Sequence, residues 1–181
     1  FKNWYKIKFI NNFIMKTNLT KRGYSICKDE LSQYEIDELK KDLTVKPFIN
    51  GDYGVAPKSF PTFCESIKKL YIPRFYGQKK YGLSTNNKLI EPKSININFS
   101  KSLKEKQNPI VDTYLKAAEE VGGGIISVPC GYGKTVIALY IAAKLKVKTL
   151  VVVHKEFLLN QWKERIKEFI PDAKIGRLQS S

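Results

Sequence analysis

The residues with the clearest chemistry lie in the stretch VPCGYGKTV, which runs from Val128 to Val136. Gly133, Lys134 and Thr135 match the end of the phosphate-binding loop (P-loop), whose usual spacing is G-x-x-x-x-G-K-[ST]. In such a loop, backbone N–H groups surround the phosphates, the lysine reaches the outer phosphates and the hydroxyl holds Mg²⁺. The first glycine of that spacing is missing here, because Val128 occupies its position.

The sequence on either side of this loop favours a nucleotide site. A short apolar run, GIISV, precedes the loop, and the apolar run VIALYIAA follows its Gly-Lys-Thr. A phosphate-binding loop needs this order, because the helix that follows must offer its N-terminal dipole to the anion. The alternative is an ordinary helix start with a stray lysine. We favour the nucleotide site and predict that it comprises Pro129, Cys130, Gly131, Tyr132, Gly133, Lys134 and Thr135.

Alternating helices and strands are predicted around the loop. Asn108 and Pro109 are typical of a helix start, and Gly122 is typical of a helix end. A strand at GIISV, a helix from Lys134 to Leu145 and a buried strand at KTLVVV follow in turn. A helix from about Glu156 to Ile170 and a short strand at KIGRL complete the pattern. This order predicts a doubly wound α/β fold.

The first half of the chain predicts a small α+β module. Ser32 and Glu35 have the spacing of a capping box, with Leu31 and Ile36 placed as a hydrophobic staple. Beyond this helix, the pieces KLYIPRFYG and SININF are typical of strands.

The charge of the chain is strongly positive, at +15. Between Gly54 and Lys104 there are ten Lys or Arg and only two acids, Glu65 and Glu91, which gives +8 in that window alone. Such a balance favours a polyanionic partner, either nucleic acid or an anionic membrane surface. Six aromatic residues are interleaved with these charges and could stack on bases, or could form the core beneath a solvated lysine face. They are Phe60, Phe63, Tyr71, Phe75, Tyr76 and Tyr81.

Several classes of protein are excluded by composition. Three widely spaced cysteines, Cys27, Cys64 and Cys130, together with a single histidine provide neither a zinc site nor a disulfide framework. They are typical of a reducing compartment. No apolar run approaches the roughly 20 residues that span a bilayer, so no membrane-spanning segment is expected. Of the two polyanionic partners, we expect nucleic acid and no membrane.

The loop and its neighbours resemble superfamily-2 helicases. The form P-x-G-x-G-K-T resembles motif I of that superfamily, and TLVVVHKEFLLNQWKERI resembles its motif Ia. Upstream, LKEKQNPIVDTYL resembles the L-R-x-Y-Q element, with Gln107 as its glutamine. The match departs at Lys104, where arginine is usual, and at Lys106, where an aromatic residue is usual.

From about Thr20 to Gln179 the chain resembles DEAD/DEAH-type helicases of giant DNA viruses, which are relatives of the phage repair translocase and the poxvirus transcript-release helicase. The resemblance implies an ATP-dependent helicase or translocase that uses ATP and Mg²⁺ and acts on DNA or RNA. It also implies the first part of a RecA-like P-loop lobe. A viral origin would place the protein in the host cytoplasm or the virion.

The resemblance assigns a role to each matched residue. Lys134 would neutralise charge on the β- and γ-phosphates, and Thr135 would ligate Mg²⁺. Gly131, Tyr132 and Gly133 would supply backbone N–H groups, while Gln107 would select adenine. His154, Lys155 and Gln161 would contact the nucleic acid, chiefly its backbone. For His154 and Lys155 the alternative is a solvated turn between a strand and a helix.

Three segments are expected from these patterns. Residues 1–14 precede the only methionine, Met15, and are expected to be upstream read-through or disordered. Residues 15–100 would form the accessory module and 101–181 an incomplete RecA-like ATP-binding domain. No adjacent Asp-Glu pair follows Thr135, so we expect the sequence to stop inside the first lobe and this chain alone to be inactive.

Two other functions are compatible with the residues taken alone. Another P-loop NTPase, such as a small-molecule kinase, would share the loop but would have a substrate lid after the second strand. A non-enzymatic nucleic-acid-binding module would depend on residues 54–104 and would show no coupling to ATP.

Overall fold

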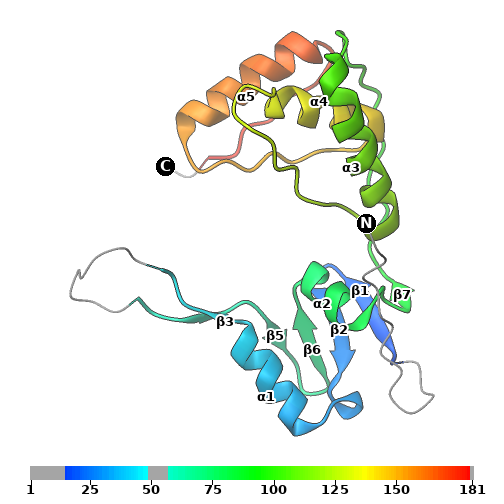
Figure 1. Ribbon diagram of the computed structural model, residues 1–181, viewed down its shortest axis with the longest axis vertical. Coiled ribbons are helices and arrows are strands. Elements are labelled where there is room, and N and C mark those ends of the chain that lie inside the picture. The colour runs from blue at the N-terminus through cyan, green and yellow to red at the C-terminus, as the bar shows by residue number, and fades with distance from the viewer. Residues whose placement is uncertain (1–14, 49–56, 180–181) are drawn as a thin grey trace. The chain divides into compact units, whose positions relative to one another are not determined.

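The computed structural model describes residues 15–48 and 57–179 (Figure 1). The chain divides into two compact units, Phe1–Ile90 and Glu91–Ser181. The sequence-based boundary at residue 100 therefore falls inside the second unit. Residues 1–14, for which read-through or disorder is expected, lie outside the described residues.

The first unit is built on a five-stranded sheet with the order β5-β6-β2-β1-β7. Its strands are β1 (Thr17–Thr20), β2 (Gly23–Cys27), β5 (Cys64–Glu65), β6 (Lys69–Ile72) and β7 (Asn86–Asn87). All neighbouring pairs are antiparallel except β1 and β7, which are parallel. A separate antiparallel pair joins β3 (Thr44–Val45) to β4 (Phe60–Pro61).

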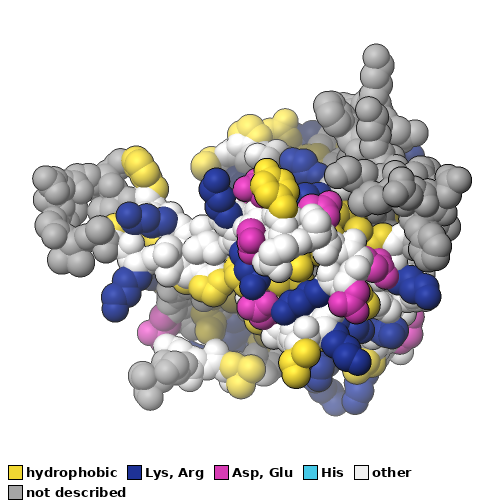
Figure 2. Space-filling view, turned by 90° about the horizontal axis from the view of Figure 1, so that it is seen from below, with side chains coloured by type: hydrophobic (Ala, Val, Ile, Leu, Met, Phe, Trp, Pro, Cys, Tyr) yellow, Lys and Arg dark blue, Asp and Glu magenta, His cyan; other side chains and the backbone are white. Residues whose placement is uncertain are grey.

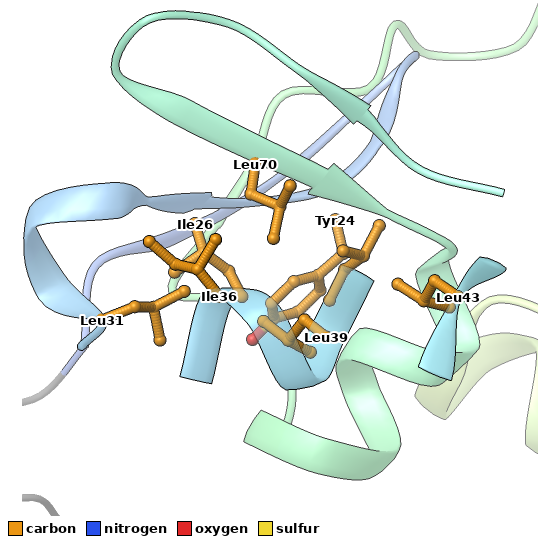
Figure 3. Packing of buried hydrophobic residues seen from close by; sticks show 8 residues of the cluster. Tyr24, Ile26, Leu31, Ile36, Leu39, Leu43 and Leu70 are labelled. Carbon is orange, nitrogen blue, oxygen red and sulfur yellow. The ribbon is translucent and has the colours of Figure 1, made fainter. Parts of the chain in front are cut away.

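Helix α1 (Gln33–Asp42) begins at the predicted capping box. The Ser32 hydroxyl accepts from the Glu35 N–H at 3.2 Å, and the Glu35 carboxylate accepts from the Ser32 N–H at 3.0 Å. A short 3-10 helix, η1 (Lys28–Glu30), connects β2 to this start. Figure 3 shows the apolar side of α1 packed against the sheet. The core comprises Tyr24, Ile26, Leu31, Ile36, Leu39, Leu43, Leu70 and Ile72.

Helix α2 (Arg74–Tyr81) corrects the predicted strand KLYIPRFYG. Strand β6 ends at Ile72, and Pro73 caps the helix that follows. Proline has no N–H to donate to a strand ladder, so it ends the strand and starts the helix instead. Helix α2 packs closely on the buried Tyr24 ring, and Gly77 makes this possible: a Cβ there would lie 2.4 Å from Tyr24 Cγ.

The second unit contains the three predicted helices. They are α3 (Asn108–Val121), α4 (Lys134–Leu145) and α5 (Glu156–Phe169). Gly122 caps α3 with a left-handed backbone at φ 85°, as predicted for a helix end. A 3-10 helix, η2 (Glu105–Gln107), leads directly into α3.

The prediction of hydrogen-bonded strands in the second unit is wrong. Residues 124–128, 148–153 and 174–178 are extended segments that form no ladder with one another (Figure 1). Their apolar side chains are largely exposed: Ile125 is 95% exposed, Val152 83% and Leu178 89%. A β-prone segment becomes a strand only when a neighbour satisfies its backbone groups. The sequence alone predicts that a segment tends to be extended, but it does not predict which segment pairs with it.

The predicted strand SININF is also extended without forming part of a sheet. Its alternation is real, because Ile97 is buried while Ile95 and Phe99 pack partly against the same cluster. That cluster joins the segment to α4 and α5 through Leu139, Ala143, Phe169 and Ile170. The first residue of the segment, Ser94, forms an isolated antiparallel bridge with Val147, which no further ladder extends. Period-two burial was therefore predicted correctly and strand pairing was not.

The predicted class, a mixed α/β fold, is confirmed. Among the described residues, one hydrophobic cluster lies in the first unit and two lie in the second. Within residues 15–48 and 57–179, no helix combines the length and the apolar character that crossing a membrane requires.

Candidate nucleotide-binding site

The loop between residues 128 and 134 has the backbone of a phosphate-binding turn. Gly131 and Gly133 both adopt left-handed conformations, at φ 79° and φ 81°. Residues with a Cβ rarely adopt this region, so the two glycines allow the tight turn. Gly133 is the N-cap of α4, and its carbonyl accepts from the Ile137 N–H at 3.0 Å. The loop therefore ends at a helix N-terminus, where an anion is electrostatically favoured.

Lys134 is the first residue of α4, and its ammonium group turns back over the loop. Its Nζ donates to the Pro129 carbonyl at 3.0 Å. This contact places the charge across the turn and leaves the side chain exposed to a ligand. In the described part of the chain, the Thr135 hydroxyl has no hydrogen-bond partner, so it is free to ligate an ion.

A dedicated metal cage is absent from the residues that the structure describes, since no group of three or more His, Cys, Asp and Glu side chains comes together. Mg²⁺ commonly binds through one or two protein oxygens together with substrate phosphates. The Thr135 hydroxyl at the helix start fits that mode.

Gln107 lies against the loop and is 3% exposed. Its Nε2 donates to the Tyr132 carbonyl at 2.8 Å, and its Oε1 accepts from the Lys104 N–H at 2.9 Å. The structure therefore brings this sequence-predicted residue to the P-loop. An amide has two N–H groups and two lone pairs, so half of its hydrogen-bonding capacity is used here.

One contact of the loop has no counterpart in the sequence-based prediction. The Lys106 ammonium lies 4.4 Å from the centroid of the Tyr132 ring, which is the geometry of a cation–π interaction. Sequence reasoning assigned Tyr132 only a backbone role. The available signal was the position of Lys106 directly before Gln107, which places it on the same 3-10 helix.

The predicted nucleic-acid contacts lie at the start of α5. His154 and Lys155 are exposed, and Lys155 is the N-cap of the helix. Gln161 is exposed two turns further along α5. Across residues 57–179, no hydrogen bond connects these three side chains to the P-loop. His154 and Lys155 stand at the start of a helix, where phosphate contact is electrostatically favourable, and their role in binding nucleic acid stays a prediction.

The six aromatic residues of the basic window serve two different purposes. Phe63, Tyr76 and Tyr81 pack against the core of the first unit. The Tyr76 hydroxyl also donates to Asp42 at 2.9 Å, and burial together with this carboxylate raises the pKa of Tyr76 to about 12. By contrast, Phe60 and Phe75 are each 50% exposed. Phe63, Tyr76 and Tyr81 are therefore core residues, whereas base stacking by Phe60 and Phe75 stays a prediction.

Two of these aromatics carry an arginine over the ring. The Arg22 guanidinium lies 5.5 Å from the Tyr71 ring centroid, and the Arg74 guanidinium lies 5.6 Å from that of Phe75. Residues 66–90 contain six basic residues and no acid, whereas residues 28–42 contain six acids. On the face drawn in Figure 2, Lys and Arg side chains alternate with Asp and Glu.

A comparison with protein families supports the resemblance to superfamily-2 helicases independently. The family model described as "Type III restriction enzyme, res subunit" matches residues 90–180, which include the P-loop and α3, α4 and α5. The chain belongs to this family of superfamily-2 helicases. The predicted relationship to helicases of giant DNA viruses is confirmed by its relatives.

The relatives differ in how much of the chain they match. A protein of Acanthamoeba polyphaga mimivirus named "Putative ATP-dependent RNA helicase" is 38% identical over 91% of this chain and 33% of its own length. A "Putative helicase" of Invertebrate iridescent virus 6 is 36% identical over 79% of this chain and 32% of its own length. A DNA 3'-5' translocase of Sulfurisphaera tokodaii is 43% identical over 38% of this chain and 15% of its own length. The chain therefore spans about a third of the length of the viral relatives.

Proposed function

We propose that this chain supplies the ATP-binding P-loop of an ATP-dependent nucleic-acid helicase or translocase. The observation that carries the proposal is the turn from Gly131 to Lys134. Gly131 and Gly133, both with left-handed backbones, lead into the N-terminus of α4. The Lys134 Nζ lies back over the loop and donates to the Pro129 carbonyl at 3.0 Å. The family match supports the same function.

Each residue of the loop has a defined task in this proposal. Lys134 exchanges the Pro129 carbonyl for the β- and γ-phosphates of ATP. Backbone N–H groups of Gly131, Tyr132 and Gly133 surround the phosphate oxygens. Thr135 holds Mg²⁺, which neutralises phosphate charge when it is bound. Gln107 uses its remaining N–H group and lone pairs to select adenine.

Nucleic acid is the proposed polymeric partner. In the second unit, the exposed His154 and Lys155 precede a helix N-terminus and suit phosphate contact. In the first unit, the lysines around β6 and α2 are accompanied by the half-exposed Phe75. Such a combination holds a backbone by charge and bases by stacking, without sequence preference.

Different observations distinguish the helicase from the small-molecule kinase and from the non-enzymatic nucleic-acid-binding module. Family membership favours a helicase over a small-molecule kinase. A non-enzymatic nucleic-acid-binding module would bind the polymer equally well with and without ATP. We also propose that the 181-residue chain by itself hydrolyses ATP poorly, because no adjacent Asp-Glu pair follows Thr135 to activate a water.

Substitution of Lys134 by alanine tests the proposal. The change removes a charge-assisted contact worth roughly 1.5–3 kcal/mol, so ATP affinity should fall about tenfold or more. Calorimetric titration of ATP into the whole protein measures this effect. Lys116→Ala is the control, because Lys116 is an exposed lysine on α3 and its loss changes the charge equally. Equal ATP affinity in the Lys134→Ala variant and in the unmodified protein would refute the assignment.

A further inference from the structure

The Lys106 ammonium group contacts an aromatic ring, that of Tyr132, and not a carboxylate. Six cation–π contacts occur among the described residues, and Lys106 over Tyr132, at 4.4 Å, is the shortest. Lys101 has a similar contact with Phe169 but also an ion pair with Glu168. No ion pair involves Lys106 in the part of the chain that the structure describes. Its ammonium group therefore rests on the aromatic ring of the P-loop.

Tyr132 is held at two points by two consecutive residues. Its ring lies under the Lys106 ammonium, and its carbonyl accepts from Gln107 Nε2 at 2.8 Å. Gln107 is 3% exposed, so this second contact is protected from water. A Cβ at Gly133 would lie 2.6 Å from the same Nε2 atom, which shows how closely the η2 segment approaches the loop.

The position of Tyr132 makes these contacts consequential. It stands between Gly131 and Gly133, which both have left-handed backbones and much conformational freedom. A loop that becomes ordered when a ligand binds loses conformational entropy, and a loop that is already held in place loses less. The part that these contacts order is the backbone that would surround the phosphates in the proposed function.

We propose that Lys106 and Tyr132 form a latch that positions the P-loop for the phosphates of any nucleotide. They are positioning residues, because their side chains contact each other and act through the loop backbone. The proposal rests on nucleotide binding at this loop. It predicts a loss of affinity that is independent of the base, in contrast to the proposed role of Gln107 in selecting adenine.

Paired substitutions in the whole protein test the latch, with ADP and GDP as the titrated nucleotides. Lys106→Met and Tyr132→Leu remove the cation and the ring, and each should weaken both nucleotides by about two- to fivefold. Lys106→Arg and Tyr132→Phe keep the interaction and should bind as the unmodified protein does. The double variant Lys106→Met with Tyr132→Leu should bind no more weakly than either single variant.

Three results would overturn the latch. These are unchanged affinity in Lys106→Met, additive losses in the double variant, and a loss confined to ADP, which would instead assign the pair to the base. The midpoint of thermal unfolding should stay unchanged in all variants, because both side chains lie at the surface of the loop; a drop matching the affinity loss would make the pair merely structural. An unmodified protein that binds neither nucleotide would refute the proposed function itself.

Discussion

At the scale of single residues, the loop shows why the turn forms although the first glycine of the motif is missing. The absent first glycine is replaced by Val128, yet the left-handed turn depends on Gly131 and Gly133. The sequence was sufficient to predict these two glycines, Lys134 and the helix that follows. It did not predict the Tyr132 ring contact, because the approach of η2 to the loop is a tertiary feature.

Gln107→Ala tests adenine selection. A site that hydrogen-bonds a group rejects analogues that lack it, so the preference for ATP over GTP should fall more than the affinity for ATP. Competition titrations of the two nucleotides measure this preference. Gln161→Ala is the control, since Gln161 is exposed on α5. An unchanged preference with equal losses for both nucleotides would mean that Gln107 acts only through the Tyr132 carbonyl.

At the scale of elements, helices were predicted well and strands poorly, for a physical reason. A helix satisfies its hydrogen bonds within one segment, so caps and periodicity define it locally; α1, α4 and α5 illustrate this. A strand needs a neighbour, which the local sequence does not specify. Residues 148–153 thus have the composition of a buried strand but remain extended and largely exposed. Similarly, the second half of the predicted strand KLYIPRFYG forms α2, because Pro73 ends β6 and caps the helix.

Gly77→Ala tests the packing of α2 on the sheet. The added Cβ would lie within 2.7 Å of three Tyr24 atoms, and Tyr24 is fully buried. Overpacking of this kind costs about 1–3 kcal/mol, so the first unit should unfold more easily. Urea unfolding followed by Tyr fluorescence measures the change. Gly176→Ala is the control, because no heavy atom lies within 4 Å of its built Cβ. Equal stability of the two variants would contradict the close packing of α2.

At the scale of the whole molecule, charge is distributed unevenly along the first unit. Acids concentrate around α1, while residues 66–90 hold only basic charges, at Lys68, Lys69, Arg74, Lys79, Lys80 and Lys88. Composition therefore predicts a polyanion-binding module, and this prediction is still to be tested. Which aromatic residues remain exposed was not predictable, because core packing decides between Phe63 and Phe75.

Replacement of Lys68, Lys69, Lys79 and Lys80 by glutamine tests this module. Each phosphate neutralised contributes roughly −0.9 to the slope of log K against log salt on duplex DNA, so the slope should become shallower. Fluorescence anisotropy of labelled DNA at increasing salt measures it. A control with the same charge change replaces Lys41, Lys46, Lys116 and Lys174, which are all exposed. Identical slopes for the two variants would show that the four lysines only keep the module soluble.

We propose that ATP turnover at this P-loop is coupled to nucleic acid, and an ATPase assay on the whole protein tests this coupling. ATP hydrolysis is followed with and without single-stranded DNA or RNA, for the unmodified protein and for Lys134→Ala. We predict that one of the polymers accelerates hydrolysis and that Lys134→Ala abolishes turnover in every condition. Turnover that ignores both polymers, or that survives loss of Lys134 at the unmodified rate, would contradict it.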